Sequence, residues 1–244
     1  MNLMKIAPGS NCLVFSVFGF FVKVALSMGA GRGLKREQVG ENKAIADEFW
    51  NDLIASGKYF GGMFKWAPIG VEPNNVKALE PLLQILHARI DMLSPVTNPW
   101  AAIFKSSVDF LSETACTDRF IEALFAGEAR ASTHGDFCKS NCLITNGHPV
   151  LIDWGNFRDD FWAPYDIVHF DVVKEADRNG KAWRVILEDR IACNEMSIEQ
   201  AARYALCRCE LELQQDIFLN RLTLSRRGKY TEALGWAQGM VGEI

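Results

Sequence analysis

One segment, from Ser132 to Gly155, constrains the fold of this chain more than any other part of the sequence. Two short apolar runs, Leu143-Ile144 and Val150-Leu151-Ile152, flank a turn that contains Asn146-Gly147. This pattern predicts a β-hairpin. A hairpin brings the residue just before its first strand close to the residue just after its second strand.

Oxygen-bearing side chains occupy the base of this predicted hairpin. Asn141 precedes the first strand, Asp153 follows the second, and Asp136 lies on the loop that leads in. Oxygen ligands of this kind suit Mg²⁺, which takes one or two carboxylates together with substrate phosphates. Phosphoryl transfer also needs a carboxylate that accepts the proton of the attacking hydroxyl. A single Asp or Asn beside a turn is usually a structural cap; the spaced combination favours a functional site.

A lysine lies inside one of the most apolar stretches of the chain. The runs Leu13 to Phe18 and Phe20 to Leu26 are rich in Val and Phe and predict a second hairpin. Lys23 falls in its second strand, so its side chain must face either solvent, as an edge-strand charge, or a partner charge. At a phosphoryl-transfer site it would hold the nucleotide.

A long helix is expected over residues 37–55, and it carries Glu37, Glu41 and Glu48. Met28 to Gly33, before it, is expected to be a flexible, glycine-rich connection. That stretch lacks the lysine and hydroxyl of a P-loop.

The rest of the chain is predicted to change from strands to helices. Two short strands and a turn are expected over 59–71, and helices over 76–93, 101–111, 117–126 and 199–222. The polar, proline-bearing stretch 72–75 suggests a boundary. We therefore expect an α+β fold with a small β-rich lobe (1–73) that contains one helix, followed by a larger helical lobe (74–244).

Composition restricts the partners and the compartment. The chain has 244 residues, 49% hydrophobic, with a net charge of −4, which argues against disorder and against nucleic acid as a partner. The apolar run 11–26 is shorter than the roughly 20 residues of a spanning helix and contains Lys23. We therefore expect no transmembrane segment. The seven cysteines lack zinc-site spacing, which favours reduced thiols and a cytoplasmic protein.

These motifs resemble those of the aminoglycoside phosphotransferase and choline kinase family, relatives of protein kinases. The family pattern is His-Gly-Asp-x-x-x-x-Asn, then a hydrophobic pair and turn, then Ile-Asp-Trp or Ile-Asp-Phe, and later a Pro-x-x-Asp-Leu-like helix start. This chain supplies His134-Gly135-Asp136, Asn141, Ile152-Asp153-Trp154 and Pro164-Tyr165-Asp166-Ile167. The resemblance is specific over about 130–170 and weaker over 9–56.

The resemblance implies a two-lobed protein kinase-like fold. It also implies ATP- and Mg²⁺-dependent transfer of the γ-phosphate to a hydroxyl of a small molecule or sugar. Asp136 would be the catalytic base, and Asn141 and Asp153 would bind Mg²⁺. Lys23 would contact the α/β-phosphates, held by Glu41, with Glu37 as the alternative.

Other positions follow the family less closely. Ser10 and Asn11, in the single-glycine turn Pro8-Gly9-Ser10-Asn11, would contact the nucleotide in place of a Gly-x-Gly-x-x-Gly loop. His134 and Asp166 would brace the catalytic loop. Cys138 stands where the small-molecule kinases often have His, and Lys139 is either a γ-phosphate contact or a solvated charge.

The sequence is compatible with several other functions. A minimal protein serine/threonine kinase and a catalytically inactive kinase-like binding protein are the alternatives to a small-molecule kinase. A carboxylate cluster that binds metal without nucleotide is a further one. The aromatic residues after Asp153 could stack on a sugar, although core packing is the more common role of such residues; they are Trp154, Phe157, Phe161 and Trp162.

Overall fold

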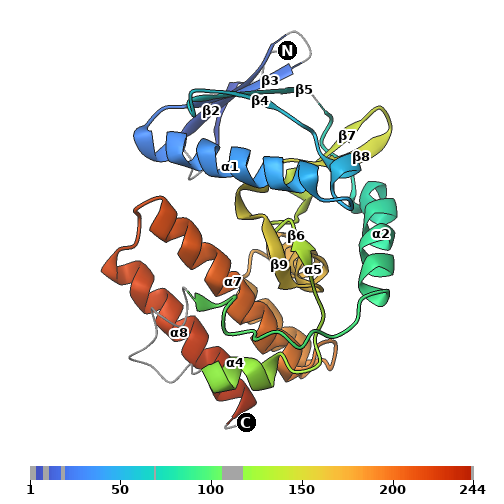
Figure 1. Ribbon diagram of the computed structural model, residues 1–244, viewed down its shortest axis with the longest axis vertical. Helices are drawn as coiled ribbons and strands as arrows, with labels where there is room; N and C mark the ends of the chain where they lie inside the picture. Colours follow the sequence, from blue (N-terminus) through green and yellow to red (C-terminus); the bar gives the residue numbers. More distant parts are fainter. Residues whose placement is uncertain (1–3, 8–10, 18–19, 69, 106–117, 243–244) are drawn as a thin grey trace. The chain divides into compact units, whose positions relative to one another are not determined.

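The computed structural model describes residues 4–7, 11–17, 20–68, 70–105 and 118–242 (Figure 1). The chain forms two compact units, residues 1–87 with 134–159 and residues 88–133 with 160–244. This division differs from the single boundary expected after residue 73. The difference arises because a segment far along the chain, 134–159, packs with the amino-terminal part.

The first unit contains a five-stranded antiparallel sheet in the order β1-β2-β3-β5-β4. Its strands are β1 (Met4–Ala7), β2 (Cys12–Val17), β3 (Phe20–Ala25), β4 (Lys58–Phe60) and β5 (Phe64–Pro68). Both hairpins expected in this part of the chain are confirmed. In the register of β3 and β5, Lys23 lies directly opposite Lys65, so the two lysines share one face of the sheet.

Helix α1 (Met28–Ala46) begins earlier than the sequence pattern indicated. The expectation of a flexible connection over 28–33 is wrong, because these residues form the first turns of the helix. Ser27 caps them, since its hydroxyl accepts a hydrogen bond from Ala30 N–H at 3.2 Å. Gly31 serves close packing here, because a Cβ at this position would lie 3.0 Å from Met63 Sδ.

The end of α1 also differs from the expected position near residue 55. Asp47 ends the helix, and its carboxylate accepts hydrogen bonds from the backbone N–H groups of Phe49 and Trp50 at 2.9 and 3.3 Å. These bonds compete with further helix formation and turn the chain into a short 3-10 helix, η1 (Asn51–Leu53).

The hairpin predicted around Asn146-Gly147 is confirmed as β7 (Cys142–Thr145) and β8 (His148–Leu151). Two backbone contacts join it to the rest of the first unit. Val71 and Ile144 exchange N–H···O bonds of 3.1 and 2.8 Å, and Ala55 N–H donates to Leu151 O at 3.0 Å. The 3-10 helix η4 (Trp154–Asn156) follows the hairpin.

Helix α1 packs directly on η4. A Cβ on Gly40 would lie 1.8 Å from the carbonyl oxygen of Trp154, so only glycine permits this approach. Trp154 is fully buried and meets the ring of Trp50 edge-on at 5.5 Å. The backbone that follows Asp153 is therefore fixed against α1.

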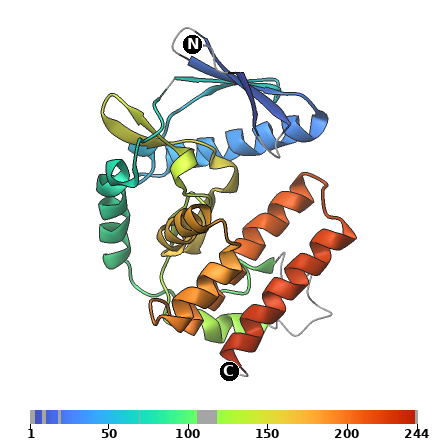
Figure 2. The same ribbon diagram turned by 180° about the vertical axis from the view of Figure 1, so that it is seen from behind.

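The second unit is mainly helical, as expected. It contains α4 (Asp118–Leu124), α5 (Tyr165–Asn179), α6 (Trp183–Ala192), α7 (Ile198–Phe218) and α8 (Leu224–Val241). Figures 1 and 2 show α7 and α8 side by side. Strands β6 (Arg130–Thr133) and β9 (Arg158–Trp162) pair near the start of this unit.

Two other helices predicted from the sequence have different outcomes in the structure. The helix expected over 76–93 is a 3-10 turn, η2 (Val76–Leu79), continued by α2 (Glu80–Asp91). Most of the helix expected over 101–111 lies outside the described residues.

The four aromatic residues that follow Asp153 are all buried, so they belong to the core: Trp154, Phe157, Phe161 and Trp162.

The mixture of a small antiparallel sheet and a larger helical part confirms the α+β fold class. Among the described residues, no helix has the length and apolar character that crossing a bilayer requires.

We expect Gly40→Ala to destabilise the protein, because its new methyl group would overlap the carbonyl of Trp154. Overpacking of this kind costs about 1–3 kcal/mol, and each kcal/mol lowers the melting temperature of a chain this size by about 2–4 °C. Gly29→Ala, on the same helix, is the matched control, because its Cβ would meet only Ser27 Oγ at 3.8 Å. Equal melting temperatures for the two variants would contradict this packing.

Candidate active site

The base of the β7–β8 hairpin brings Asn141 and Asp153 next to each other. The backbone N–H of Ile152, the residue before Asp153, donates to the carbonyl oxygen of Asn141 at 3.0 Å. Asp153 adopts φ 64° and ψ 52°, a left-handed conformation that Asp tolerates better than most residues. This turn leads the chain from β8 into η4, and it leaves the Asp153 side chain 44% exposed.

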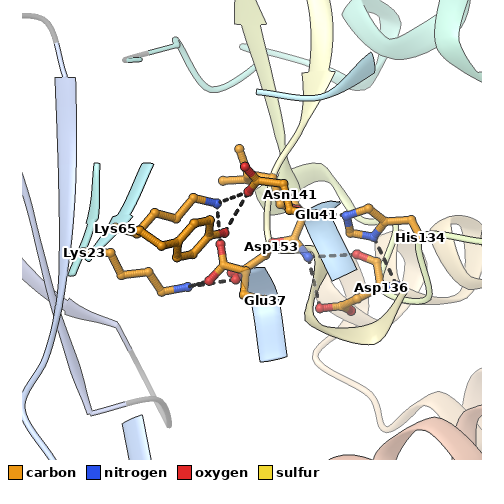
Figure 3. A network of polar contacts seen from close by, with 10 residues as sticks. Lys23, Glu37, Glu41, Lys65, His134, Asp136, Asn141 and Asp153 are labelled. Atoms are coloured by element: carbon orange, nitrogen blue, oxygen red, sulfur yellow. Dashed lines mark hydrogen bonds and ion pairs between the residues drawn. The ribbon is translucent and has the colours of Figure 1, made fainter. Parts of the chain in front are cut away.

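Asp136 joins this pair through the amide of Asn141. The Asn141 Nδ2 group donates to the backbone oxygen of Asp136 at 2.8 Å and to its Oδ2 at 3.0 Å (Figure 3). The three side chains predicted to converge are thus brought together. Because the amide nitrogen faces Asp136, the amide oxygen is the atom of Asn141 with which a cation can be bound.

His134 connects the loop of Asp136 with the end of β8. Its ring is fully buried, its Nδ1 accepts the backbone N–H of Asp136 at 3.3 Å, and its Nε2–H donates to Ile152 O at 2.9 Å. The next residue, Gly135, has φ +80°, and a Cβ there would lie 2.2 Å from Asn156 O. The backbone of this loop is therefore held on both sides.

Lys23 extends from β3 to two carboxylates. Its Nζ lies 2.9 Å from Glu37 Oε2 and 2.8 Å from Asp153 Oδ1 (Figure 3). The expectation that Glu41 holds Lys23 is therefore corrected, and the alternative, Glu37, is the partner. Glu41 lies one helical turn further along the same face of α1, where other groups bind it.

Those other groups form a second, deeper ion pair. Lys65 Nζ lies 2.6 Å from Glu37 Oε1 and 2.8 Å from Glu41 Oε2. Glu41 also accepts hydrogen bonds from the Tyr59 hydroxyl at 2.7 Å and from Gly57 N–H at 2.6 Å. The Lys65 side chain is 0% exposed, so its charge depends wholly on these partners.

The close charges shift the pKa values of Lys23, Lys65 and Asp153. Desolvation alone would lower the pKa of Lys23, but Asp153 and Glu37 outweigh it and raise that pKa. Lys65 behaves alike, since Glu37 and Glu41 raise its pKa against desolvation. Desolvation acts to raise the pKa of Asp153, yet the charge and hydrogen bond of Lys23 bring it below its ordinary range. At neutral pH the lysines and Asp153 are therefore charged.

Lys65 and Tyr59 were not anticipated from the sequence. The signal for Lys65 was present, because the residue lies among Phe64, Trp66 and Ala67 as a lone charge in an apolar strand. The same reasoning that selected Lys23 applies to it. Tyr59 carries no such signal, since tyrosine is common in strands.

The remaining sequence-predicted residues are less informative. Asn11 is exposed in the turn before β2, with φ 50°, and its carbonyl accepts Leu26 N–H at 3.0 Å. Ser10 lies outside the described residues. Lys139 is exposed, and Asp166 is buried in the first turn of α5, in the second unit. Their expected roles stay predictions.

The residues around Asp153 fit a magnesium ion. They offer a carboxylate that is partly exposed and an amide oxygen, both of the hard-oxygen type that Mg²⁺ prefers. Within the described part of the chain, no group of three or more His, Cys, Asp or Glu residues is arranged to hold a metal. Asp153 and Asn141 supply two oxygen ligands, so a Mg²⁺ ion bound there would complete its shell with phosphate oxygens and water.

Solved structures with a similar fold are small-molecule kinases. Choline kinase LicA from Streptococcus pneumoniae aligns over 96% of this chain and 94% of that chain, at 14% identity and a TM-score of 0.52. A choline/ethanolamine kinase family protein from Mesorhizobium loti aligns over 99% and 88%, at 14% identity and a TM-score of 0.50. No family model matches the sequence, and no curated protein matches it.

At this level of identity, the likeness establishes the fold and no more. The chain has the protein kinase-like fold, as its sequence motifs predicted.

We expect the thiol of Cys138 to be unreactive, although it lies two residues after Asp136. Burial, followed by the charge of Asp136, raises its pKa to about 11. At pH 8 only about one thiol in a thousand is then ionised. Iodoacetamide at pH 8 should label the exposed Cys193 well before Cys138, as read by peptide mass spectrometry.

Labelling of the unfolded protein is the control, because both cysteines should then react at similar rates. Equal labelling of Cys138 and Cys193 in the folded protein would contradict the buried position of Cys138.

Proposed function

We propose that this protein is an ATP- and Mg²⁺-dependent phosphotransferase that transfers the γ-phosphate to a hydroxyl of a small molecule or sugar. The observation that carries the proposal is the cluster of Asp136, Asn141 and Asp153 at the base of one hairpin, beside the Lys23–Glu37 ion pair. A metal-independent structural role would not require a lysine, three carboxylates and an amide to converge there.

Nucleotide binding is assigned to the lysine and the hairpin base. Lys23 contacts the α/β-phosphates, and Glu37 keeps its ammonium group in place. Asn141 and Asp153 hold Mg²⁺, which when bound supplies positive charge to the phosphates. The 44% exposure of Asp153 supports this role, because its carboxylate can be reached from solvent while it pairs with Lys23.

Asp136 is assigned as the catalytic base. Its Oδ2 is held by Asn141 Nδ2 at 3.0 Å, which orients the carboxylate. As the acceptor oxygen forms its bond to the γ-phosphorus, the bond from that phosphorus to the ADP oxygen breaks. The hydroxyl proton passes to the Asp136 carboxylate, which later releases it to water.

The acceptor class is supported by the fold. Two solved structures of similar fold are a choline kinase and a choline/ethanolamine kinase family protein, and both names point to small-molecule substrates. We propose a small-molecule or sugar hydroxyl on this basis, and protein hydroxyls are a separate outcome of the assay below. A cytoplasmic location is supported by the cysteines, because every described one is a free thiol.

We expect Mg·ATP to raise the melting temperature of the wild-type protein. A ligand at 100 times its dissociation constant stabilises the folded state by about 2.7 kcal/mol. The shift should require Mg²⁺ and disappear in Asp153→Ala, which loses the carboxylate assigned to the metal. Asp159→Ala is the control, because that carboxylate is exposed and pairs with the exposed Lys43 in a surface contact.

A nucleotide shift that is independent of Mg²⁺, or one that persists in Asp153→Ala, would contradict the metal assignment. Complete absence of a shift in the wild-type protein would contradict the nucleotide site.

We expect Asp136→Ala to abolish phosphoryl transfer while nucleotide binding persists. Removing a positioned base costs about 10²–10⁴ in rate. The measurement is transfer of labelled γ-phosphate to panels of hydroxyl-bearing metabolites, sugars and proteins. Transfer to proteins alone would indicate a protein kinase instead of a small-molecule kinase. An undiminished rate in Asp136→Ala would show that Asp136 is not the catalytic base. Nucleotide binding without any transfer would favour an inactive kinase-like protein.

A further inference from the structure

Glu37 divides its carboxylate between two lysines of neighbouring strands. Oε2 lies 2.9 Å from Lys23 Nζ on β3, and Oε1 lies 2.6 Å from Lys65 Nζ on β5. The strand register sets these lysines directly opposite each other, so both extend toward α1 from one level of the sheet (Figure 3). A carboxylate held at both oxygens cannot rotate without losing an ion pair.

We infer that Lys65 is a positioning residue, which fixes Glu37 so that Lys23 is held ready for the nucleotide phosphates. This inference rests on the proposed function. Lys65 itself is too deeply buried to reach a ligand, since its side chain is 0% exposed. Its effect on the nucleotide must therefore pass through Glu37 and Lys23.

Lys65 is in turn anchored by a closed set of contacts. Glu41 binds Lys65 Nζ at 2.8 Å and is itself fixed by Tyr59 and by Gly57 N–H. A Cβ on Gly57 would lie 2.6 Å from Lys65 Cε, so glycine leaves room for the lysine stem. These contacts form a chain from Gly57 and Glu41 through Lys65 to Glu37.

The arrangement also matters when Lys23 engages phosphate. Lys23 is shared between Glu37 and Asp153, so any shift of its ammonium group toward a nucleotide weakens its bond to Glu37. Glu37 is buried, with 3% exposure, and an unpaired carboxylate there is costly. Because Lys65 stays bound to Glu37 Oε1, the carboxylate keeps an ion-pair partner and its position when Lys23 moves.

A double-mutant cycle on Lys23 and Lys65 tests this inference. The dissociation constant for Mg·ATP is measured by calorimetry in the wild-type protein, Lys23→Met, Lys65→Met and the double variant. Charge-assisted hydrogen bonds contribute enough for each single variant to bind about tenfold more weakly. If Lys65 acts through Lys23, the double variant binds no more weakly than Lys23→Met alone.

Lys43→Met is the matched control. Lys43 lies on α1, the helix that carries Glu37, and pairs with the exposed Asp159. Lys43→Met therefore removes a lysine without changing a contact of Glu37. Its affinity for Mg·ATP should equal that of the wild-type protein.

Two results overturn the inference while the proposed function stands. In the first, the wild-type protein binds Mg·ATP and Lys65→Met binds it equally well. In the second, the effects of the two single variants multiply in the double variant, which would mean that Lys65 acts on the fold and not through Lys23. A wild-type protein that does not bind Mg·ATP removes the proposed function, and the inference with it.

A second variant covers loss of folding. If Lys65→Met does not fold, the combined variant Lys65→Met/Glu41→Gln takes its place in the cycle. This combination removes one buried charge of each sign. Under the inference this pair folds and still binds Mg·ATP about tenfold more weakly, because Glu37 Oε1 has lost its partner. Wild-type affinity in this pair would mean that Lys65 only balances charge, and would overturn the inference.

Discussion

One buried lysine, one partly buried lysine and two buried glutamates hold the sheet of the first unit to helix α1. Lys65, Glu37 and Glu41 are almost completely shielded from water, and Lys23 is 14% exposed. Removing one partner from such a group leaves an uncompensated charge, at a cost of about 3–5 kcal/mol. The strands and the helix must therefore keep the relative position in which every charge is paired, and that position also brings Lys23 to Asp153.

A backbone contact fixes the other side of the same helix. Gly40 lets α1 approach the carbonyl of Trp154, and the backbone at Trp154 continues directly from Asp153. Glu37 and Asp153, the two carboxylates that bind Lys23, are thus positioned by the same helix through different contacts. A site fixed in this way spends little binding energy on ordering its own groups, which favours catalysis by positioning.

The fold is shared with kinases at 14% identity, although no family model matches the sequence. Such divergence is physically reasonable, because most positions of a fold require only a suitable size, polarity and backbone conformation. The site is more demanding, since each of its groups needs a particular charge at a particular atom. For that reason the proposed function rests on four residues and not on the overall likeness: Lys23, Asp136, Asn141 and Asp153.

The sequence by itself determined the local elements and the hairpin base. Two short apolar runs and the Asn146-Gly147 turn specified β7 and β8, and the closeness of Asn141 and Asp153 followed from hairpin geometry alone. Tertiary structure decided what depends on contacts between distant segments. Glu37 and Glu41 lie on one face of the same helix, so the sequence could not say which of them binds Lys23. In the folded chain, Gly57 N–H binds Glu41 Oε1, and Tyr59 and Lys65 bind Glu41 Oε2, whereas Glu37 gives only Oε1 to Lys65 and binds Lys23 with Oε2. Gly40 likewise lies in a helix despite its low propensity, because the backbone carbonyl of Trp154 approaches too closely for any larger residue.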